Sequence, residues 1–193
     1  MGREIRLVRL APPVMQALLA GDLASASREA GATLSPYLVE EGWLWRIRLP
    51  QVEQDPGTLD WIARAAIDLA SGVVVGHVGF HGPPDEQGMV EVAYSVDPAL
   101  RRRGWGRELL RAALVWAETE PAVRTVRASV SPENVASLTL VRGFGFVQVG
   151  EQWDEEDGLE LVFELPLQRP TPGPAGGRAG SAGRAGGPAT GPR

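Results

Sequence analysis

Three short apolar runs in the middle of the chain alternate with turn residues and predict a small β-meander. The runs cover Trp61–Leu69, Val73–Phe80 and Met89–Val96, and the second is dense in β-branched side chains. Ala70-Ser71-Gly72 separates the first two runs, and Gly82-Pro83-Pro84-Asp85 interrupts the chain after the second. Links this short leave no room for a crossover, so the three strands are expected to pair antiparallel.

The second half of the chain alternates helical and extended patterns. A helix is expected over Trp105–Glu118, whose apolar face holds Leu109, Leu110, Ala113, Leu114 and Ala117. Next come a strand, a short helix and a final strand pair, at residues 123–130, 135–141, 146–152 and 159–165. The helix between Val96 and Val123 makes a crossover, which requires two parallel neighbouring strands. The fold class is therefore α+β with a mixed, mostly antiparallel sheet.

The two ends of the chain have weaker patterns of apolar and polar residues. Ile5–Leu10 reads as a strand, and helical segments follow until Ser35-Pro36 breaks them, whereas residues 37–54 fit a helix or a loop equally well. From Pro166 the composition changes to Pro, Gly, Ala and Arg, which offers almost nothing apolar to bury. We therefore expect one folded domain over residues 1–165 and a disordered tail over residues 166–193.

Composition excludes several kinds of site. The chain has no cysteine, so disulfides, thiolate ligands and cysteine nucleophiles are absent, and with only His77 and His81 no metal site is expected. No run approaches the roughly 18 apolar residues of a membrane helix, and the first residues do not resemble a signal peptide. These features predict a cytoplasmic protein that does not enter a membrane.

The charge is unevenly spread along the chain. All 19 basic residues are arginines, and residues 166–193 hold four of them and no acid, so the first 165 residues carry 15 arginines against 24 acids. A body with net charge −9 repels nucleic acid and attracts cations. A negative surface equally serves solubility alone.

The segment Arg101-Arg102-Arg103-Gly104-Trp105-Gly106 lies where the third strand of the meander gives way to a helix. Two glycines at a helix start let successive main-chain N–H groups point outward, and the helix dipole with three arginines favours an anion there. The segment lacks the third glycine of a dinucleotide fingerprint and the lysine of a P-loop. A diphosphate that is not part of a nucleoside triphosphate suits this turn. The alternative is that the same residues only start a helix and bind no ligand.

Two blocks in this order resemble the GNAT N-acetyltransferases. The pattern Arg-x-x-Gly-x-Gly is met by Arg101, Gly104 and Gly106, and the later Asn134-Val135-Ala136-Ser137 is followed by a helix and Gly143-Phe144. Ser131-Pro132-Glu133-Asn134 is similar to the RimJ/RimL-like branch. The resemblance implies a splayed central sheet flanked by helices in a three-layer α/β/α sandwich, with acetyl-CoA as cosubstrate. It also allows a homodimer.

The resemblance assigns residues to acetyl-CoA. The main chain of Arg102–Arg107 would hold the pyrophosphate and the end of the strand before it would pair with the pantetheine arm. The complete expected set is Tyr94, Ser95, Val96, Arg101, Arg102, Arg103, Gly104, Trp105, Gly106, Arg107, Asn134 and Ser137.

The resemblance also suggests the catalytic residues. Acetyl transfer to an amine needs a base that takes the ammonium proton, and Glu91 stands on the strand where many relatives place it. The alternative is that Glu91 is a solvent-exposed glutamate near a sheet edge without a catalytic role. Many relatives protonate the leaving thiolate with a tyrosine at the position of Val141, so Ser137 is the substitute here, unless its hydroxyl only satisfies nearby main-chain groups. Asn134 has the composition of an N-cap as well as that of a cofactor contact.

Other candidates stay open between a functional and a structural role. His77 and His81 would share a strand face and could relay a proton or simply bond a neighbour. Trp43, Trp45 and Trp61 could line the acceptor pocket or belong to the core. Residues 154–157, all acidic, form a solvated hairpin or collect a cationic acceptor.

The sequence thus predicts transfer of an acetyl group to a primary amine of a small molecule or amino sugar. The alternatives are acetylation of a protein N-terminal amine and a non-catalytic acyl-CoA-binding module.

Overall fold

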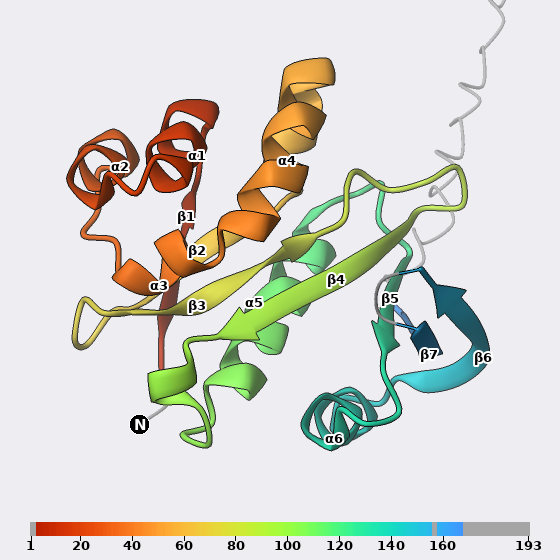
Figure 1. Ribbon diagram of the computed structural model, residues 1–193. Helices are drawn as coiled ribbons and strands as arrows, with labels where there is room; N and C mark the ends of the chain where they lie inside the picture. The colour runs from red at the N-terminus through yellow and green to blue at the C-terminus, as the bar shows by residue number, and fades with distance from the viewer. Residues whose placement is uncertain (1–2, 156–157, 168–193) are drawn as a thin grey trace, which may run out of the picture.

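A single seven-stranded sheet organises the chain in the computed structural model, which describes residues 3–155 and 158–167. The strand order is β1-β2-β3-β4-β5-β7-β6 (Figure 1). The strands are β1 Ile5–Arg9, β2 Arg64–Asp68, β3 Val74–Phe80, β4 Met89–Val96, β5 Thr125–Val130, β6 Val147–Asp154 and β7 Gly158–Pro166.

The pairing confirms the predicted topology. The strands β2, β3 and β4 form the antiparallel meander, and β4 and β5 are parallel neighbours joined by the long helix α5 (Trp105–Thr119). All other pairs are antiparallel, so the α+β class with a mixed sheet is confirmed.

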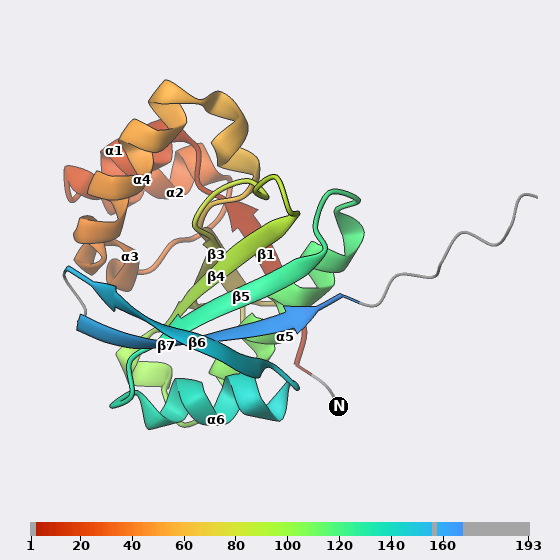
Figure 2. The same ribbon diagram turned by 90° about the vertical axis from the view of Figure 1, so that its right-hand side faces the viewer.

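Helices cover both faces of the sheet, as the three-layer prediction requires (Figures 1 and 2). The helices α1 Pro12–Leu19, α2 Leu23–Ala30, α3 Pro36–Glu40 and α4 Gly42–Gln54 pack with β1 and β2 around one apolar cluster. The helices α5 and α6 (Val135–Gly143) enclose a second cluster on the other face, centred on Leu109, Leu110 and Phe163. The sheet therefore separates two cores.

The undecided stretch at residues 37–54 is helical. Trp45 is fully buried and its indole N–H donates to the Leu38 carbonyl at 2.5 Å, so tertiary packing decides the conformation that the local pattern left open. Pro50 lies inside α4.

The predicted strand over Trp61–Leu69 begins too early. The chain forms a 3₁₀ turn at Pro56–Asp60, and β2 starts only at Arg64, because the N–H groups of Trp61 and Ile62 are already bonded to Thr58 O. At the other end, β7 includes Pro166, and the Leu167 N–H donates to Arg124 O, so ordered pairing passes the predicted boundary at 165. The rest of the predicted tail lies outside the described residues and stays a prediction.

Close packing between β3 and β4 leaves no space for a side chain at Gly76. A Cβ there would collide with the carbonyl of Ser95 and would come within 3.1 Å of Leu109 Cδ1. We expect Gly76→Ala to lower the free energy of unfolding by about 1–3 kcal/mol, the usual effect of overpacking. Urea unfolding measures the change. Gly82→Ala is the matched control, because a Cβ at Gly82 meets nothing within 4 Å and its effect should stay within about 0.5 kcal/mol. Equal stability of the two variants would contradict the packing argument.

Candidate functional site

The strands β4 and β5 diverge after Glu91. They pair only from Met89 to Glu91 against Thr125 to Arg127. Beyond this point β4 remains bonded to β3, and β5 remains bonded to β7, so the two halves of the sheet separate as units. The divergence leaves one edge of residues 92–96 without a strand partner, and main-chain groups on such an edge can pair with an extended ligand.

The open edge leads to the arginine-glycine turn at the start of α5. Arg102 and Gly104 have positive φ values of 57° and 85°, which reverse the chain direction before the helix. No described residue accepts a hydrogen bond from the main-chain N–H groups of residues 102–107. Six neighbouring donors at a helix N-terminus form a concentrated anion-binding surface. The turn at residues 101–106 thus has the backbone geometry of an anion site, and its assignment to a cofactor stays a prediction.

Neighbouring side chains fix the shape of this turn. Arg101 Nε donates to the Val96 carbonyl at 3.3 Å, which ties the turn to the end of β4. Arg3 reaches across from the N-terminus, donates to the Arg103 carbonyl and stacks on Trp105 at 4.6 Å from the ring centre. The side chains of residues 101–103 are exposed, so their guanidinium groups remain available to phosphate oxygens.

A cavity of about 420 Å³ lies in the gap between the separated strands. Its lining includes Glu91, Tyr94, Ser129, Asn134, Ser137 and Gln152. Glu91 shares a face of β4 with Ser95, which pairs with His77 on the side of α3 and α4. Tyr94 lies on the opposite face and contacts α6. The cavity therefore reaches both faces of the sheet.

Glu91 is held by a polar network on the α4 face. Ser129 Oγ donates to its carboxylate at 2.5 Å, and Gln152 Nε2 links Ser129 Oγ at 3.1 Å with Glu160 at 2.9 Å. His81 Nδ1 lies 4.0 Å from the other Glu91 oxygen. The Glu91 side chain is 20% exposed, so it is neither a free surface group nor sealed in the core. A partly covered carboxylate next to an imidazole can accept a proton from a bound ligand.

Two hydroxyl groups meet on the other face. Tyr94 Oη donates to Ser137 Oγ at 3.4 Å, and burial raises the pKa of Tyr94 although the bond to Ser137 opposes that shift. The phenol therefore keeps its proton at neutral pH. Asn134 caps α6 by accepting from the Ser137 N–H at 3.1 Å, which confirms its N-cap role. Val141 is fully buried and lies on the cavity wall as an apolar side chain.

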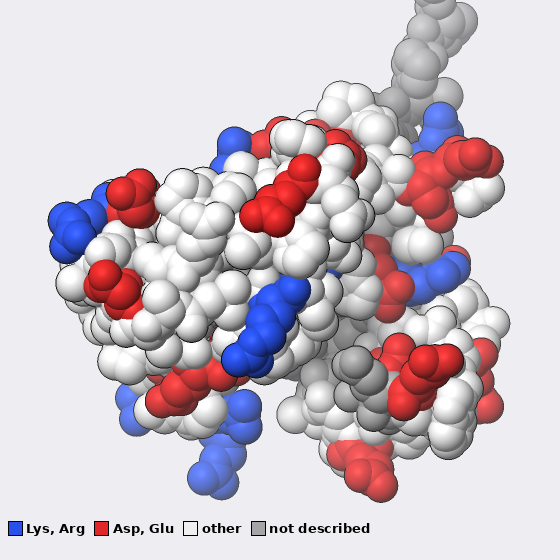
Figure 3. Space-filling model, turned by 45° about the horizontal axis from the view of Figure 1, so that its top comes forward, with Lys and Arg blue, Asp and Glu red and all other residues white. Residues whose placement is uncertain are grey.

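A second cavity, of about 700 Å³, continues toward the solvent between α4 and the β6–β7 hairpin. Trp43 and Ile47 stand on the α4 wall, and Trp153 with Asp154 and Glu155 stand on the hairpin wall. Figure 3 shows a hollow between the helical layer and the smaller lobe at the right, with acidic side chains gathered on that lobe. Residues 156–157 of the predicted acidic run lie outside the described residues. Trp43 is 55% exposed, whereas Trp45 belongs to the core and Trp61 packs against Phe80.

His77 has a structural environment. It is 4% exposed, its Nε2 lies 3.2 Å from Glu41, and its ring stacks on Tyr37. The bond to His77 holds the pKa of Glu41 below its ordinary value. This contact joins α3 to β3. Of the two histidines, only His81 lies next to Glu91.

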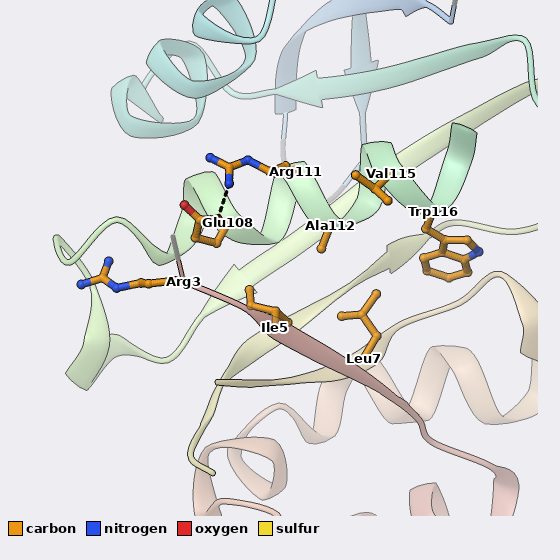
Figure 4. A pocket seen from close by; sticks show the side chains of 8 residues that line it. All are labelled: Arg3, Ile5, Leu7, Glu108, Arg111, Ala112, Val115 and Trp116. Carbon is orange, nitrogen blue, oxygen red and sulfur yellow. Dashed lines mark ion pairs between the residues drawn. The ribbon is translucent and has the colours of Figure 1, made fainter. Parts of the chain in front are cut away.

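A third cavity, of about 320 Å³, lies on the other side of the molecule between β1 and α5 (Figure 4). Its apolar part comes from Ile5, Leu7, Val115 and Trp116, and its carboxylate, Glu108, is already paired with Arg111 at 2.9 Å. Among residues 3–155 and 158–167 no three His, Asp or Glu side chains gather as a metal site would require, and no helix there is long and apolar enough to cross a bilayer.

Comparison with known proteins agrees with this geometry. The family model described as an acetyltransferase (GNAT) domain matches residues 12–147. The chain belongs to the GNAT family. An uncharacterised N-acetyltransferase from Bacillus subtilis (strain 168) is 31% identical over 74 residues, which cover 38% of this chain and 44% of that relative, so the match spans less than half of the relative.

Solved structures of GNAT proteins share the fold at low identity. Ribosomal-protein-S5-alanine acetyltransferase from Vibrio fischeri matches with a TM-score of 0.57 and 16% identity, covering 86% of this chain and 93% of that chain. A spermidine N-acetyltransferase chimera from Vibrio cholerae also gives 0.57, with 17% identity over 84% and 95% of the two chains. These two neighbours differ in acceptor, so the shared fold does not identify one.

The structure brings Glu91 and Ser137 to one cavity and places the arginine-glycine turn between β4 and α5, whereas their roles stay predictions. Sequence reasoning missed Ser129, Gln152 and the hydroxyl of Tyr94. The alternation of side chains along each strand can be read from the sequence. The register between β4 and β5, which brings Ser129 near Glu91, cannot be read from either strand alone.

The pKa of His81 provides a test of this arrangement. Partial burial lowers that pKa, although 55% of the His81 side chain is exposed, and the nearby Glu91 carboxylate raises it, the first effect being larger. We expect an NMR titration to place the pKa of His81 below 6.5. In Glu91→Gln it should fall further, because the charge that stabilises the imidazolium is lost. Glu151→Gln, an exposed change on β6, serves as control and should leave the pKa unmoved. A higher pKa in Glu91→Gln would contradict the contact.

Proposed function

We propose that the protein moves an acetyl group from acetyl-CoA directly to a primary amine of a small molecule or amino sugar. The observation that carries this proposal is the continuous path from six unpaired N–H groups at α5, along the open edge of β4, to the Glu91 carboxylate. A diphosphate, an amide-containing arm and a reacting amine would find their chemical complements in that order. Family membership supports acetyl-CoA as the donor.

The donor would be bound mainly by main-chain groups. The N–H groups of Arg102–Arg107 suit the pyrophosphate, and Arg101, Arg102 and Arg103 add positive charge beside it. Residues Tyr94, Ser95 and Val96 suit the amide groups of the pantetheine arm, because the β5-facing edge of β4 is open there. Main-chain N–H groups near Ser95 and Val96 would polarise the thioester carbonyl.

Glu91 is the proposed base. The acceptor arrives as an ammonium ion, and Glu91 takes one proton from it directly or through a water molecule. The freed nitrogen lone pair then forms the C–N bond to the acetyl carbon as the C–S bond breaks, and the nitrogen gives up its remaining excess proton to water. Ser129 fixes the carboxylate with a 2.5 Å hydrogen bond and leaves the oxygen near His81 for the proton. Partial burial lowers the pKa of His81 and so favours its neutral imidazole, which can share that proton.

Ser137 is the proposed donor of the proton that the CoA thiolate takes up. Its hydroxyl can pass a proton to the CoA sulfur and regain one from Tyr94, whose O–H donates to it, and Tyr94 then regains a proton from solvent. Proton removal and proton return would then occur on opposite faces of the sheet, so the two groups do not neutralise each other. The proposal gives Tyr94 a side-chain role in addition to the main-chain contact expected from the sequence.

A second acceptor class has some support. A named structural neighbour acetylates a ribosomal protein, and the 700 Å³ cavity opens to solvent beside Trp43. A protein N-terminal amine could enter there. A non-catalytic acyl-CoA-binding module would share the donor site, and the turnover experiment below separates it. The absence of cysteine and the net charge of −5 support a cytoplasmic protein without a nucleic-acid partner, and the homodimer stays a prediction.

Acetyl-CoA should stabilise the fold. At 100 times its dissociation constant we expect about 2.7 kcal/mol of stabilisation, which corresponds to a rise in Tm of about 5–10 °C. The double variant Arg102→Gln, Arg103→Gln should weaken this response, since charged contacts to the phosphates are lost. Arg46→Gln, an exposed change on α4, is the control. A thermal-shift titration in which saturating acetyl-CoA leaves Tm unchanged would refute the donor assignment.

Removing the base should separate binding from turnover. With an acceptor found by CoA-release screening of amines, amino sugars and N-terminal peptides, Glu91→Gln should lower kcat by about 10²- to 10⁴-fold and keep acetyl-CoA affinity. Ser137→Ala should lower kcat less, because a thiolate leaves readily without a full proton transfer. Glu151→Gln is the charge-matched control. Unchanged turnover in Glu91→Gln would reject the base, and an absence of turnover with every acceptor class would favour the binding module.

A further inference from the structure

Arg48 is a buried cation that has no ion-pair partner in the described part of the chain. It lies on α4 with 6% of its surface exposed, and no described carboxylate comes within 4 Å of it. Its Nη1 donates to Gln51 Oε1 and to the His81 carbonyl, both at 3.0 Å and both uncharged. Its Nε is enclosed and has no hydrogen-bond partner among the described residues. Burying a guanidinium without a counter-charge costs stability unless a ligand supplies that charge.

Arg48 also stands at the proposed reaction centre. It lines the 700 Å³ cavity together with His81, Ala93 and Tyr94, so the cation borders the space left for the acceptor. A single residue connects it to the proposed base, because His81 accepts from Arg48 through its carbonyl and approaches Glu91 to 4.0 Å through Nδ1. Arg48 and Glu91 line adjoining cavities that share His81, Ala93 and Tyr94 on their walls, so an acceptor that lies across both cavities can contact each of them.

We propose that Arg48 binds a carboxylate of the acceptor, and that the acceptor is a small amino carboxylate whose amine faces Glu91. This inference rests on the proposed acetyl transfer and narrows its substrate class. The guanidinium is a flat donor group that suits a carboxylate, and its Nη2 donates to no described residue. A plain amine would satisfy Glu91 and leave Arg48 without a partner.

The other charged groups around the cavity make it dipolar. Glu91 and Glu160 line the adjoining 420 Å³ cavity, and Asp154 and Glu155 lie on the hairpin wall of the 700 Å³ cavity, across from α4. Glu155 is exposed, so water and salt weaken its field, whereas Arg48 is shielded from both. A ligand with one positive and one negative group fits such a cavity better than a ligand with either charge alone.

Apolar walls indicate the body of the acceptor. Trp43, Ile47 and Trp153 are 55%, 44% and 77% exposed and line the same cavity. Indole and aliphatic surfaces left open beside an amine and a carboxylate subsite suit an apolar side chain between them. The class is therefore an amino carboxylate with an apolar side chain, such as L-phenylalanine.

The test compares L-phenylalanine with phenethylamine, which lacks only the carboxylate and is equally protonated at pH 7.5. Tryptophan fluorescence reports binding of each to the full chain saturated with CoA, and CoA release from acetyl-CoA reports kcat/KM. We expect L-phenylalanine to bind about 10- to 100-fold tighter and to show the same preference in kcat/KM. Equal values for the two compounds, or tighter binding of an N-terminal peptide amide such as Ser-Ala-Gly-NH₂, would overturn the proposal.

Variants of Arg48 locate the preference. Arg48→Gln should abolish the ratio between the two compounds, Arg48→Lys should restore part of it, and Arg46→Gln on the exposed side of the same helix should leave it intact. A full ratio in a folded Arg48→Gln variant would overturn the assignment. If Arg48→Gln does not fold, the ratio of L-phenylalanine to phenethylamine in Arg48→Lys is compared with the wild-type ratio, and an unchanged ratio would overturn the assignment. Absence of acetyl-CoA binding would instead reject the proposed transferase function, so the two failures remain distinguishable.

Discussion

The separation of β4 from β5 after Glu91 is the constraint on which the rest of the site depends. A continuous sheet would use the main-chain groups of residues 92–96 for its own ladder and would bury Glu91 and Tyr94 on unconnected faces. Because the two half-sheets part as units, each strand stays bonded on its outer side while the inner edge remains free. Main-chain N–H groups without a partner cost free energy, and a ligand that accepts hydrogen bonds along this edge would remove that cost. The cavity, the open edge of β4 that leads to the turn, and the access to the hydroxyl groups of Tyr94 and Ser137 all depend on this separation of the two strands.

The parts of the fold that the sequence predicted are those set by short-range rules. Short links at residues 69–73 and 81–88 made the β2–β3–β4 meander antiparallel, and a 15-residue helix between β4 and β5 made that pair parallel. The turn before α5 could be predicted because it needs a glycine, Gly104 at φ 85°, directly before a helical pattern, and both features can be read from neighbouring residues in the sequence. Glu91 and Ser137 were placed by resemblance to a family, and geometry then brought them to one cavity.

The remaining parts depend on contacts between distant segments. The helix α4 contains Pro50 and six large apolar residues without clear periodicity, and it forms because Trp45 is packed under α3. Gln152, Ser129 and Glu160 become neighbours only through the registers of β5, β6 and β7. No pattern within α4 reveals that β3 ends beside Arg48. Register and helix docking were the missing information.

The reach of Arg3 to the carbonyl of Arg103, 100 residues away, has a consequence for synthesis of the chain. The helices α1 to α4 and the two strands beside them complete their own core within the first 80 residues, so they can assemble while the ribosome still holds the rest. The donor turn cannot close at that stage, because its other half has not yet emerged. The wall proposed for the acceptor is therefore built first, and the turn proposed to bind phosphate closes onto a preassembled N-terminal half.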